Sequence, residues 1–247
     1  MQFKNNVKAF EKFGHCEIKF FFTSKELKSL KLFVKKNLKE NNDKTFFLSS
    51  RSNKKLSNFF LKNKSIHLKL TKFIKNLCIN LKIQYNKKNE IYKVLRVIKN
   101  KRIQNESLQF HFDAHLITIL IPIIIPKRKK SNNGHLLLSP NLRKNYNSII
   151  INIFQKIFYQ SILKRIFPLT FLFKWLKFKK IVLKPGSIFL FNGFRSLHGN
   201  LDIDKRDTRA TMLFHYHDLF PNSKLVRFNR SLRIKNENKR ILENLND

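Results

Sequence analysis

The chain has 247 residues, of which 42% are hydrophobic, and its 52 Lys and Arg against 15 Asp and Glu give a formal net charge of +37. This hydrophobic content, with 26 Phe, excludes wholesale disorder, and no window of about 20 residues is free of charge, which argues against a transmembrane helix. The two cysteines make neither a disulfide framework nor a zinc-ribbon spacing, so we expect free thiols in a reducing compartment, the cytoplasm. The first ten residues lack the apolar segment of a signal peptide.

The net charge has two explanations that the sequence leaves open. A field of this size attracts phosphates, nucleic acid or anionic lipid. The chain is also rich in Lys, Asn, Ile and Phe and holds only five Gly, which is the usage expected of a very A+T-rich genome. Scarce residue types are therefore informative. Three of the five Gly lie within residues 186–199, and Asp113 is one of only three acids between Asp43 and Asp202.

The first 90 residues show mostly helical periodicity. Residues 15–22 alternate as a short strand, and Thr23 or Ser24 then caps a helix that runs to about residue 39. A polar connection follows at residues 41–53. A second helix is predicted at residues 65–81, where the apolar positions share one face.

From residue 91 the period becomes that of strands. Residues 91–98 alternate partly, and residues 110–125 form a nearly unbroken apolar, β-branched run that is typical of a buried strand. A helix is predicted at residues 148–167, where Pro168 ends or kinks it. The remaining predicted elements are strands at 135–138, 179–183, 187–191 and 209–218, and a polar helix or frayed end at 230–247.

Two candidate metal ligands stand at the head of the 110–125 run. His111 and Asp113 are two residues apart, so in a strand their side chains point to the same side. An imidazole nitrogen and a carboxylate oxygen each bind a divalent metal. A third ligand, ideally another His, would complete the two-His, one-carboxylate set of non-haem Fe(II) oxygenases.

Residues 184–218 supply a candidate third ligand and an anion clamp. His198 follows the strand predicted at 187–191, and Gly199 lets the backbone pass close to the site without a Cβ. Arg209 opens a strand among small and apolar neighbours, and an Arg that points inward must find an anion. A guanidinium forks onto a carboxylate, such as the distal carboxylate of 2-oxoglutarate, whose 2-oxo acid end can chelate the metal.

These residues carry a resemblance to a known family. The pattern of His111-x-Asp113, then about 85 residues to His198, then Arg209 eleven further on, resembles Fe(II)/2-oxoglutarate dioxygenases of the phytanoyl-CoA dioxygenase type. Residues 185–199 (P-G-S-I-F-L-F-N-G-F-R-S-L-H-G) look like the family's approach to its distal His. Fainter similarity extends from about residue 10 to 218. Where the family often has Ser two residues after the distal His and Asn near the fifth, this chain has Asn200 and Ile203.

The resemblance implies a mainly β fold with flanking helices, a double-stranded β-helix or cupin-like jelly-roll barrel. It implies that His111, Asp113 and His198 bind Fe(II), that Arg209 binds 2-oxoglutarate and that Asn200 hydrogen-bonds this co-substrate. The implied reaction uses O2, releases succinate and CO2, and hydroxylates a C–H bond of a small, lipid-like or anionic substrate.

The chain has neither an internal repeat nor a Gly/Ser-rich linker, so we predict one domain, 1–247. Residues 1–90 would support the barrel, residues 91–218 would form its core with a helical insertion at about 148–178, and residues 219–247 would form a C-terminal tail.

Several alternatives remain open at this stage. His111 and Asp113 also fit a structural pair. His115, His215 and His217 fit either pocket hydrogen bonds or ligands of a different site, and Arg209 could form a salt bridge with a nearby Asp. Residues 149–180 mix apolar side chains with Lys and Arg, so they either contact a membrane peripherally or pack as outer helices.

Two other functions compete with the oxygenase. One is a basic protein that binds nucleic acid or an anionic surface on a non-catalytic jelly-roll, which the net charge motivates. The other is a cupin-like enzyme with another metal and no oxo acid.

Overall fold

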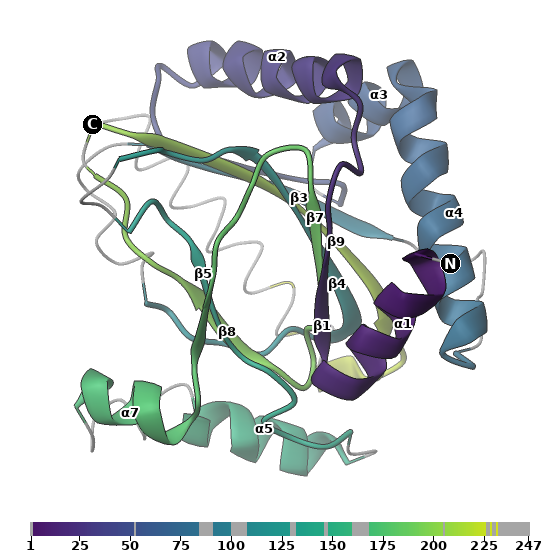
Figure 1. Cartoon of the computed structure of the whole chain (residues 1–247), viewed down its shortest axis with the longest axis vertical. Coiled ribbons are helices and arrows are strands. Elements are labelled where there is room, and N and C mark those ends of the chain that lie inside the picture. Colours follow the sequence, from purple (N-terminus) through teal and green to yellow (C-terminus); the bar gives the residue numbers. More distant parts are fainter. Residues whose placement is uncertain are drawn as a thin grey trace.

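The structure, a computed structural model, describes residues 2–51, 53–83, 91–99, 108–128, 132–145, 148–159, 168–204, 206–225, 228 and 231. Its strands form two antiparallel sheets that face each other (Figure 1). The larger sheet has six strands in the order β1-β7-β4-β9-β3-β2, and the smaller has three in the order β6-β5-β8. This arrangement confirms the predicted jelly-roll-like fold with flanking helices.

The larger sheet consists of β1 (His15–Ile18), β7 (Ile188–Asn192), β4 (His115–Ile124), β9 (Thr208–Asp218), β3 (Tyr92–Lys99) and β2 (Phe46–Ser49). The smaller sheet consists of β6 (Lys179–Ile181), β5 (Leu136–Ser139) and β8 (Leu197–Asn200). The helices are α1 (Gln2–Phe13), α2 (Ser24–Glu40), α3 (Lys54–Lys62), α4 (Lys64–Asn80), α5 (Ile149–Ile157) and α7 (Leu169–Trp175).

Strand β4 lies at the centre of the larger sheet, between β7 and β9. Its outward side chains, among them Ile117, Ile119 and Ile121, pack toward the helices, whereas Leu120 joins the cluster between the two sheets. A strand that is buried on both faces has no need of polar alternation. This explains why residues 110–125 read as an unbroken apolar run.

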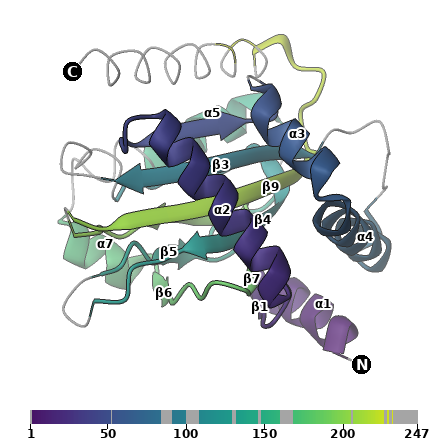
Figure 2. The same ribbon diagram turned by 90° about the horizontal axis from the view of Figure 1, so that it is seen from above.

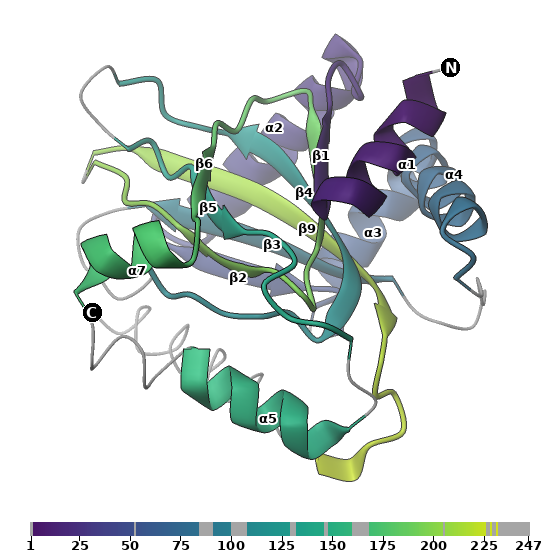
Figure 3. The ribbon, with the colours of Figure 1, turned by 60° about the horizontal axis from the view of Figure 1, so that its bottom comes forward.

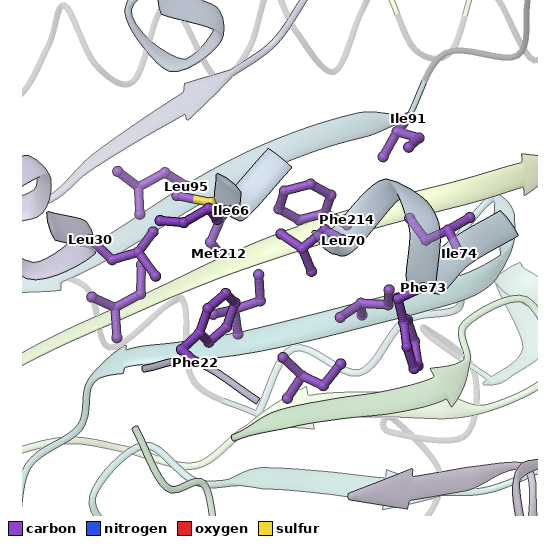
Figure 4. Close-up of a cluster of buried hydrophobic side chains, with 14 of the residues drawn as sticks. Phe22, Leu30, Ile66, Leu70, Phe73, Ile74, Ile91, Leu95, Met212 and Phe214 are labelled. Atoms are coloured by element: carbon purple, nitrogen blue, oxygen red, sulfur yellow. The ribbon is translucent and has the colours of Figure 1, made fainter. Parts of the chain in front are cut away.

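Helices α1 to α4 lie on the outer side of the larger sheet, and α2 crosses it (Figure 2). Side chains of α2 and α4 pack onto β3 and β9, as with Leu30 and Leu70 against Leu95 and Phe214 (Figure 4). Burial of each such side chain stabilises the fold by about 1.5–3 kcal/mol. This layer covers the outer face of the larger sheet.

The start of α2 confirms the predicted cap. Thr23 Oγ1 accepts a hydrogen bond from the backbone N–H of Glu26 (3.2 Å), and Glu26 Oε2 accepts one from the backbone N–H of Thr23 (2.9 Å). This reciprocal pair is a capping box.

Helices α5 and α7 lie on the opposite side of the molecule from α1 to α4, with the sheets between them (Figure 3). Leu172 and Leu176 of α7 pack with Leu137, Phe110 and Phe112 in a separate cluster. Helix α7 therefore packs on the outer side of the smaller sheet. The extent of the helical insertion predicted at about 148–178 stays a prediction.

Some predicted elements need correction. Residues 41–53 were expected to be a polar connection, but they contain β2, which pairs with β3. Helices α1 and α3 were not predicted. His198 lies within β8 rather than after a strand. Residues 160–167 of the predicted helix, and the tail beyond residue 231, lie outside the described part of the chain.

The most informative correction concerns the ligand segment. Residues 111–113 do not belong to a regular strand, because β4 begins at His115. His111 exchanges two backbone hydrogen bonds with His198 of the smaller sheet (2.9 and 3.1 Å), whereas the N–H of Asp113 donates to Gly193 O (2.9 Å). The segment therefore crosses from one sheet to the other, and its two ends take partners from different sheets.

Candidate metal centre

The structure brings the three predicted ligands together. His111 and Asp113 arrive from the segment before β4, and His198 comes from β8. One ligand atom from each residue lies within 4.8 Å of the other two. Asp113 Oδ1 is 3.8 Å from His111 Nε2 and 3.7 Å from His198 Nε2. These separations exceed hydrogen-bond length and leave space for a cation among the three atoms.

Backbone carbonyls set the orientation of both imidazole rings. His111 Nδ1 lies 3.0 Å from Gln109 O, and His198 Nδ1 lies 3.0 Å from Ser196 O. A carbonyl oxygen can only accept, so each Nδ1 carries the proton and donates it. In the neutral ring the lone pair is then on Nε2, which is the atom that faces Asp113. Metal-binding histidines are oriented in this way.

The carboxylate of Asp113 is held by one of its oxygens. Thr118 Oγ1 donates a hydrogen bond to Oδ2 (2.6 Å), and the same hydroxyl lies 3.1 Å from His215 Nδ1, from which it can accept. Oδ1 is thereby turned toward the two histidines. Thr118 was not singled out in the sequence, although it is the one hydroxyl within residues 116–125.

Gly193 makes this approach sterically possible. A Cβ at position 193 would lie 2.4 Å from Asp113 Oδ2 and 2.3 Å from Thr118 Oγ1, distances that real Cβ atoms do not adopt. The backbone of the turn after β7 therefore packs directly on the carboxylate. The scarcity of Gly in this chain was a usable signal for this position.

Asp113 is ionised in this environment. Burial alone would raise the pKa of Asp113, but the positive charge available on His198, His215 and His111 and the hydrogen bond from Thr118 together lower it well below its ordinary value. A buried anion, 8% exposed, that is surrounded by histidines is a site for a cation.

Arg209 lies in β9 on the inner face of the larger sheet, and its side chain is 1% exposed. Its guanidinium donates to three neutral oxygens: Gly134 O at 2.7 Å, Asn200 Oδ1 at 2.7 Å and Thr211 Oγ1 at 3.3 Å. Among the described residues no carboxylate pairs with it, which disfavours the predicted alternative of an internal salt bridge. Burial, with a contribution from the charge of Arg96, lowers the pKa of Arg209 to about 9.

Asn200 connects the clamp to the metal centre. It lies two residues after His198 in β8, so the two side chains share a face. Its amide oxygen accepts from Arg209. Its predicted contact with 2-oxoglutarate stays a prediction. Gly134, with φ of 64°, is required here, because a Cβ would lie 2.3 Å from Arg209 Cδ.

The remaining histidines separate into different environments. His215 reaches Thr118, and its ring stacks with His115 (5.4 Å) and Tyr92 (5.8 Å). This supports a role for His215 in orienting Asp113. His217 has a φ of 61°, so the regular alternation of β9 ends before it.

Comparison with known proteins shows which solved structures share this fold. No family model matches the chain, and no curated protein matches it in sequence. Solved structures do match. They include the epimerase SnoN in complex with Fe3+, alpha ketoglutarate and nogalamycin RO (TM-score 0.57, 10% identity, 88% of this chain and 84% of that one).

Two further matches are HygX from Streptomyces hygroscopicus with nickel and 2-oxoglutarate (TM-score 0.55, 12% identity, 88% and 87% coverage) and prolyl 4-hydroxylases from Phytophthora capsici (TM-score 0.58, 12% identity, 90% and 64% coverage). Identities this low establish likeness of fold alone. The chain therefore has the fold of non-haem, 2-oxoglutarate-dependent enzymes.

Proposed function

We propose that this chain is an Fe(II)- and 2-oxoglutarate-dependent oxygenase. The observation that carries the proposal is the convergence of His111, Asp113 and His198, with ligand atoms within 4.8 Å of one another, on a fold shared with enzymes of this class. Two imidazoles and one carboxylate are the ligand set of non-haem Fe(II) oxygenases, and they leave three octahedral positions for other ligands.

The residues present fit this metal. The two Nε2 atoms and Asp113 Oδ1 supply two nitrogens and one oxygen to a common point, while Asp113 Oδ2 is taken by Thr118. Asp113 would thus bind through one oxygen. When bound, the iron and the oxo acid would supply the oxidising chemistry with O2, and the protein would orient them and exclude water.

Arg209 is the proposed anchor of the co-substrate. Among the described residues, the buried guanidinium of Arg209 is held by neutral oxygens and meets no carboxylate that compensates its charge. A dicarboxylate that reaches from the metal to Arg209 would compensate this charge through a forked pair of hydrogen bonds.

The exposure of the three ligands suggests where a substrate approaches. The side chains of Asp113 and His198 are 9% and 8% exposed, whereas that of His111 is 30% exposed. The deeper side of the triad would hold the oxo acid, and the His111 side would meet the substrate. The resemblance to phytanoyl-CoA dioxygenases implies hydroxylation of a C–H bond, and we propose a small, lipid-like or anionic molecule as the substrate.

Anaerobic addition of Fe(II) and 2-oxoglutarate to the full chain tests the proposal without a known substrate. We expect a weak visible metal-to-ligand absorption band that requires both additions. Asp113→Asn should abolish the band and metal binding, while far-ultraviolet circular dichroism confirms folding. Metal binding without any band would favour the cupin-like alternative, and absence of metal binding would contradict the whole proposal.

A further inference from the structure

Helix α5 turns its apolar side to solvent. Its apolar side chains Ile150, Phe154, Ile157 and Ile151 are 80%, 65%, 52% and 42% exposed. By contrast, Asn152 of the same helix is buried. A surface helix ordinarily does the reverse, with its apolar stripe against the core.

The inward orientation of α5 is set by specific contacts, so the outward face is not an accident of loose packing. Asn152 Oδ1 accepts a hydrogen bond from Arg143 Nη1 (2.7 Å). The guanidinium of Arg143 lies between the rings of Phe112 and Phe194, 4.1 and 4.0 Å from their centroids. These contacts keep Ile150 and Phe154 pointing away from the protein.

Helix α7 lies on the same side of the molecule as α5 (Figures 1 and 3). Phe171 and Trp175 are 48% and 51% exposed and stack with centroids 6.1 Å apart. Six of the fifteen exposed large hydrophobic side chains among the described residues belong to these two short helices. We call the six the apolar face: Ile150, Ile151, Phe154, Ile157, Phe171 and Trp175.

Positive charge adjoins the α7 part of the apolar face. Lys174 and Lys177 at the end of α7 and Lys179 and Lys180 in β6 are exposed. The sequence between Asp113 and Asp202 contains no Asp or Glu. We propose that the apolar face is a docking surface for an anionic lipid membrane, into whose interface its side chains insert while the lysines reach lipid phosphates.

Charge and side-chain type favour lipid over other occupants. Two copies of a chain of net charge +37 repel each other, which opposes self-association through this face. Nucleic acid would match the lysines, but the aliphatic side chains of Ile150, Ile151 and Ile157 gain nothing from a phosphate backbone. Acyl chains and anionic headgroups match both features. We propose that the protein docks peripherally on the membrane, since no described helix is long and apolar enough to cross a bilayer.

The docking surface is anchored next to the candidate metal centre. Leu172 and Leu176 of α7 pack in one cluster with Phe110 and Phe112, the residues on either side of His111. A docked enzyme would therefore hold its metal centre close to the membrane. This last step rests on the proposed oxygenase function, whereas docking itself does not.

Trp175 provides a local probe, because it is the only tryptophan in the chain. We would mix the full chain with vesicles of phosphatidylcholine containing about 30% phosphatidylserine. We expect flotation with the vesicles, a blue shift of tryptophan emission and quenching by brominated acyl chains. Vesicles of phosphatidylcholine alone should bind at least about tenfold more weakly.

The matched variants separate insertion from simple charge attraction. Ile150→Ser with Phe154→Ser should weaken vesicle binding by about tenfold or more. Leu61→Ser with Leu68→Ser, on α3 and α4, changes two side chains of similar exposure, 67% and 66%, and should leave binding unchanged. Circular dichroism and thermal unfolding would verify that both variants fold.

Three outcomes would overturn the proposal. The first is vesicle binding with unchanged tryptophan emission. The second is equal weakening by both pairs of substitutions. The third is absence of vesicle binding when the same protein binds RNA tightly. None of these readouts depends on oxygenase activity, so membrane docking and the proposed reaction are tested independently.

Discussion

Replacement of Arg209 by Met tests the division of labour within the candidate site. The Arg209→Met variant keeps a long side chain but removes the charge and three hydrogen bonds, to Gly134 O (2.7 Å), Asn200 Oδ1 (2.7 Å) and Thr211 Oγ1 (3.3 Å). We expect 2-oxoglutarate binding to weaken about 100-fold or more, while the affinity for a divalent metal stays within about twofold.

The magnitude follows from the buried position of Arg209, which is 1% exposed. Each charge-assisted hydrogen bond to a carboxylate contributes about 1.5–3 kcal/mol, so loss of a forked pair costs at least about 3 kcal/mol, or more than about 100-fold in affinity. Stability should change less. The oxygens of Gly134 and Asn200 lose a donor, but an uncompensated buried charge is removed.

Calorimetric titration of 2-oxoglutarate into protein loaded with Mn(II), followed by titration of Mn(II) alone, measures both affinities without turnover. Arg206→Met is the matched control, because the side chain of Arg206 is 76% exposed and pairs with Asp204 at the surface. Arg206→Met should leave both affinities unchanged. Equal loss of metal and 2-oxoglutarate in the Arg209 variant, or no loss of either, would refute the assigned role.

Other perturbations give equally definite expectations. Gly193→Ala should weaken metal binding at least tenfold in a Mn(II) titration, since its Cβ would displace the carboxylate of Asp113. Thr23→Ala should lower the free energy of unfolding by about 1 kcal/mol in urea titrations, because it removes the cap of α2. Burial raises the pKa of Cys16 to about 12 and of Cys78 to about 11, from 9. A thiol-specific reagent at pH 8 should therefore modify them slowly in native protein and rapidly in urea, and stability should fall as pH rises above 9. Rapid native modification would contradict the described core.

The candidate site could be predicted from the sequence because acidic residues are scarce in this part of the chain. Asp113 is one of three acids between Asp43 and Asp202, and an acid in so apolar a run signals a cation. Arg209 could be predicted for a similar reason, because it is a cation at the start of an apolar strand. Both inferences rest on the cost of burying charge, which holds in any fold.

The pairing of segments that are distant in the sequence could not be predicted in this way. His111 pairs with His198 of the smaller sheet while Asp113 bonds Gly193, and both partners lie more than 75 residues away along the chain. Strand β2 was missed because it is four residues long and lies inside a polar segment. Pairing with β3 and the burial of Phe46 and Leu48 in the core stabilise it.

Side-chain direction likewise depended on register. Lys93 and Arg96 are three residues apart, so alternation along the predicted strand places them on opposite faces but does not say which of them faces inward. In β3 they lie opposite Phe214 and Thr211 of β9, so they face opposite sides of the sheet. Arg96 shares the inner face with Arg209, and Lys93 lies over Phe60 on the helical side.

Local sequence pattern was thus sufficient for the helices with clear apolar stripes and for singling out the four residues proposed to hold iron and 2-oxoglutarate, because periodicity and the energetics of buried charge are properties of short segments. The jelly-roll fold was predicted only through the resemblance to a known family. Tertiary structure decided the convergence of those residues, the use of Thr118 and Gly193 to aim the carboxylate, and the outward turn of α5. These features follow from contacts between distant segments, which no short stretch of sequence encodes.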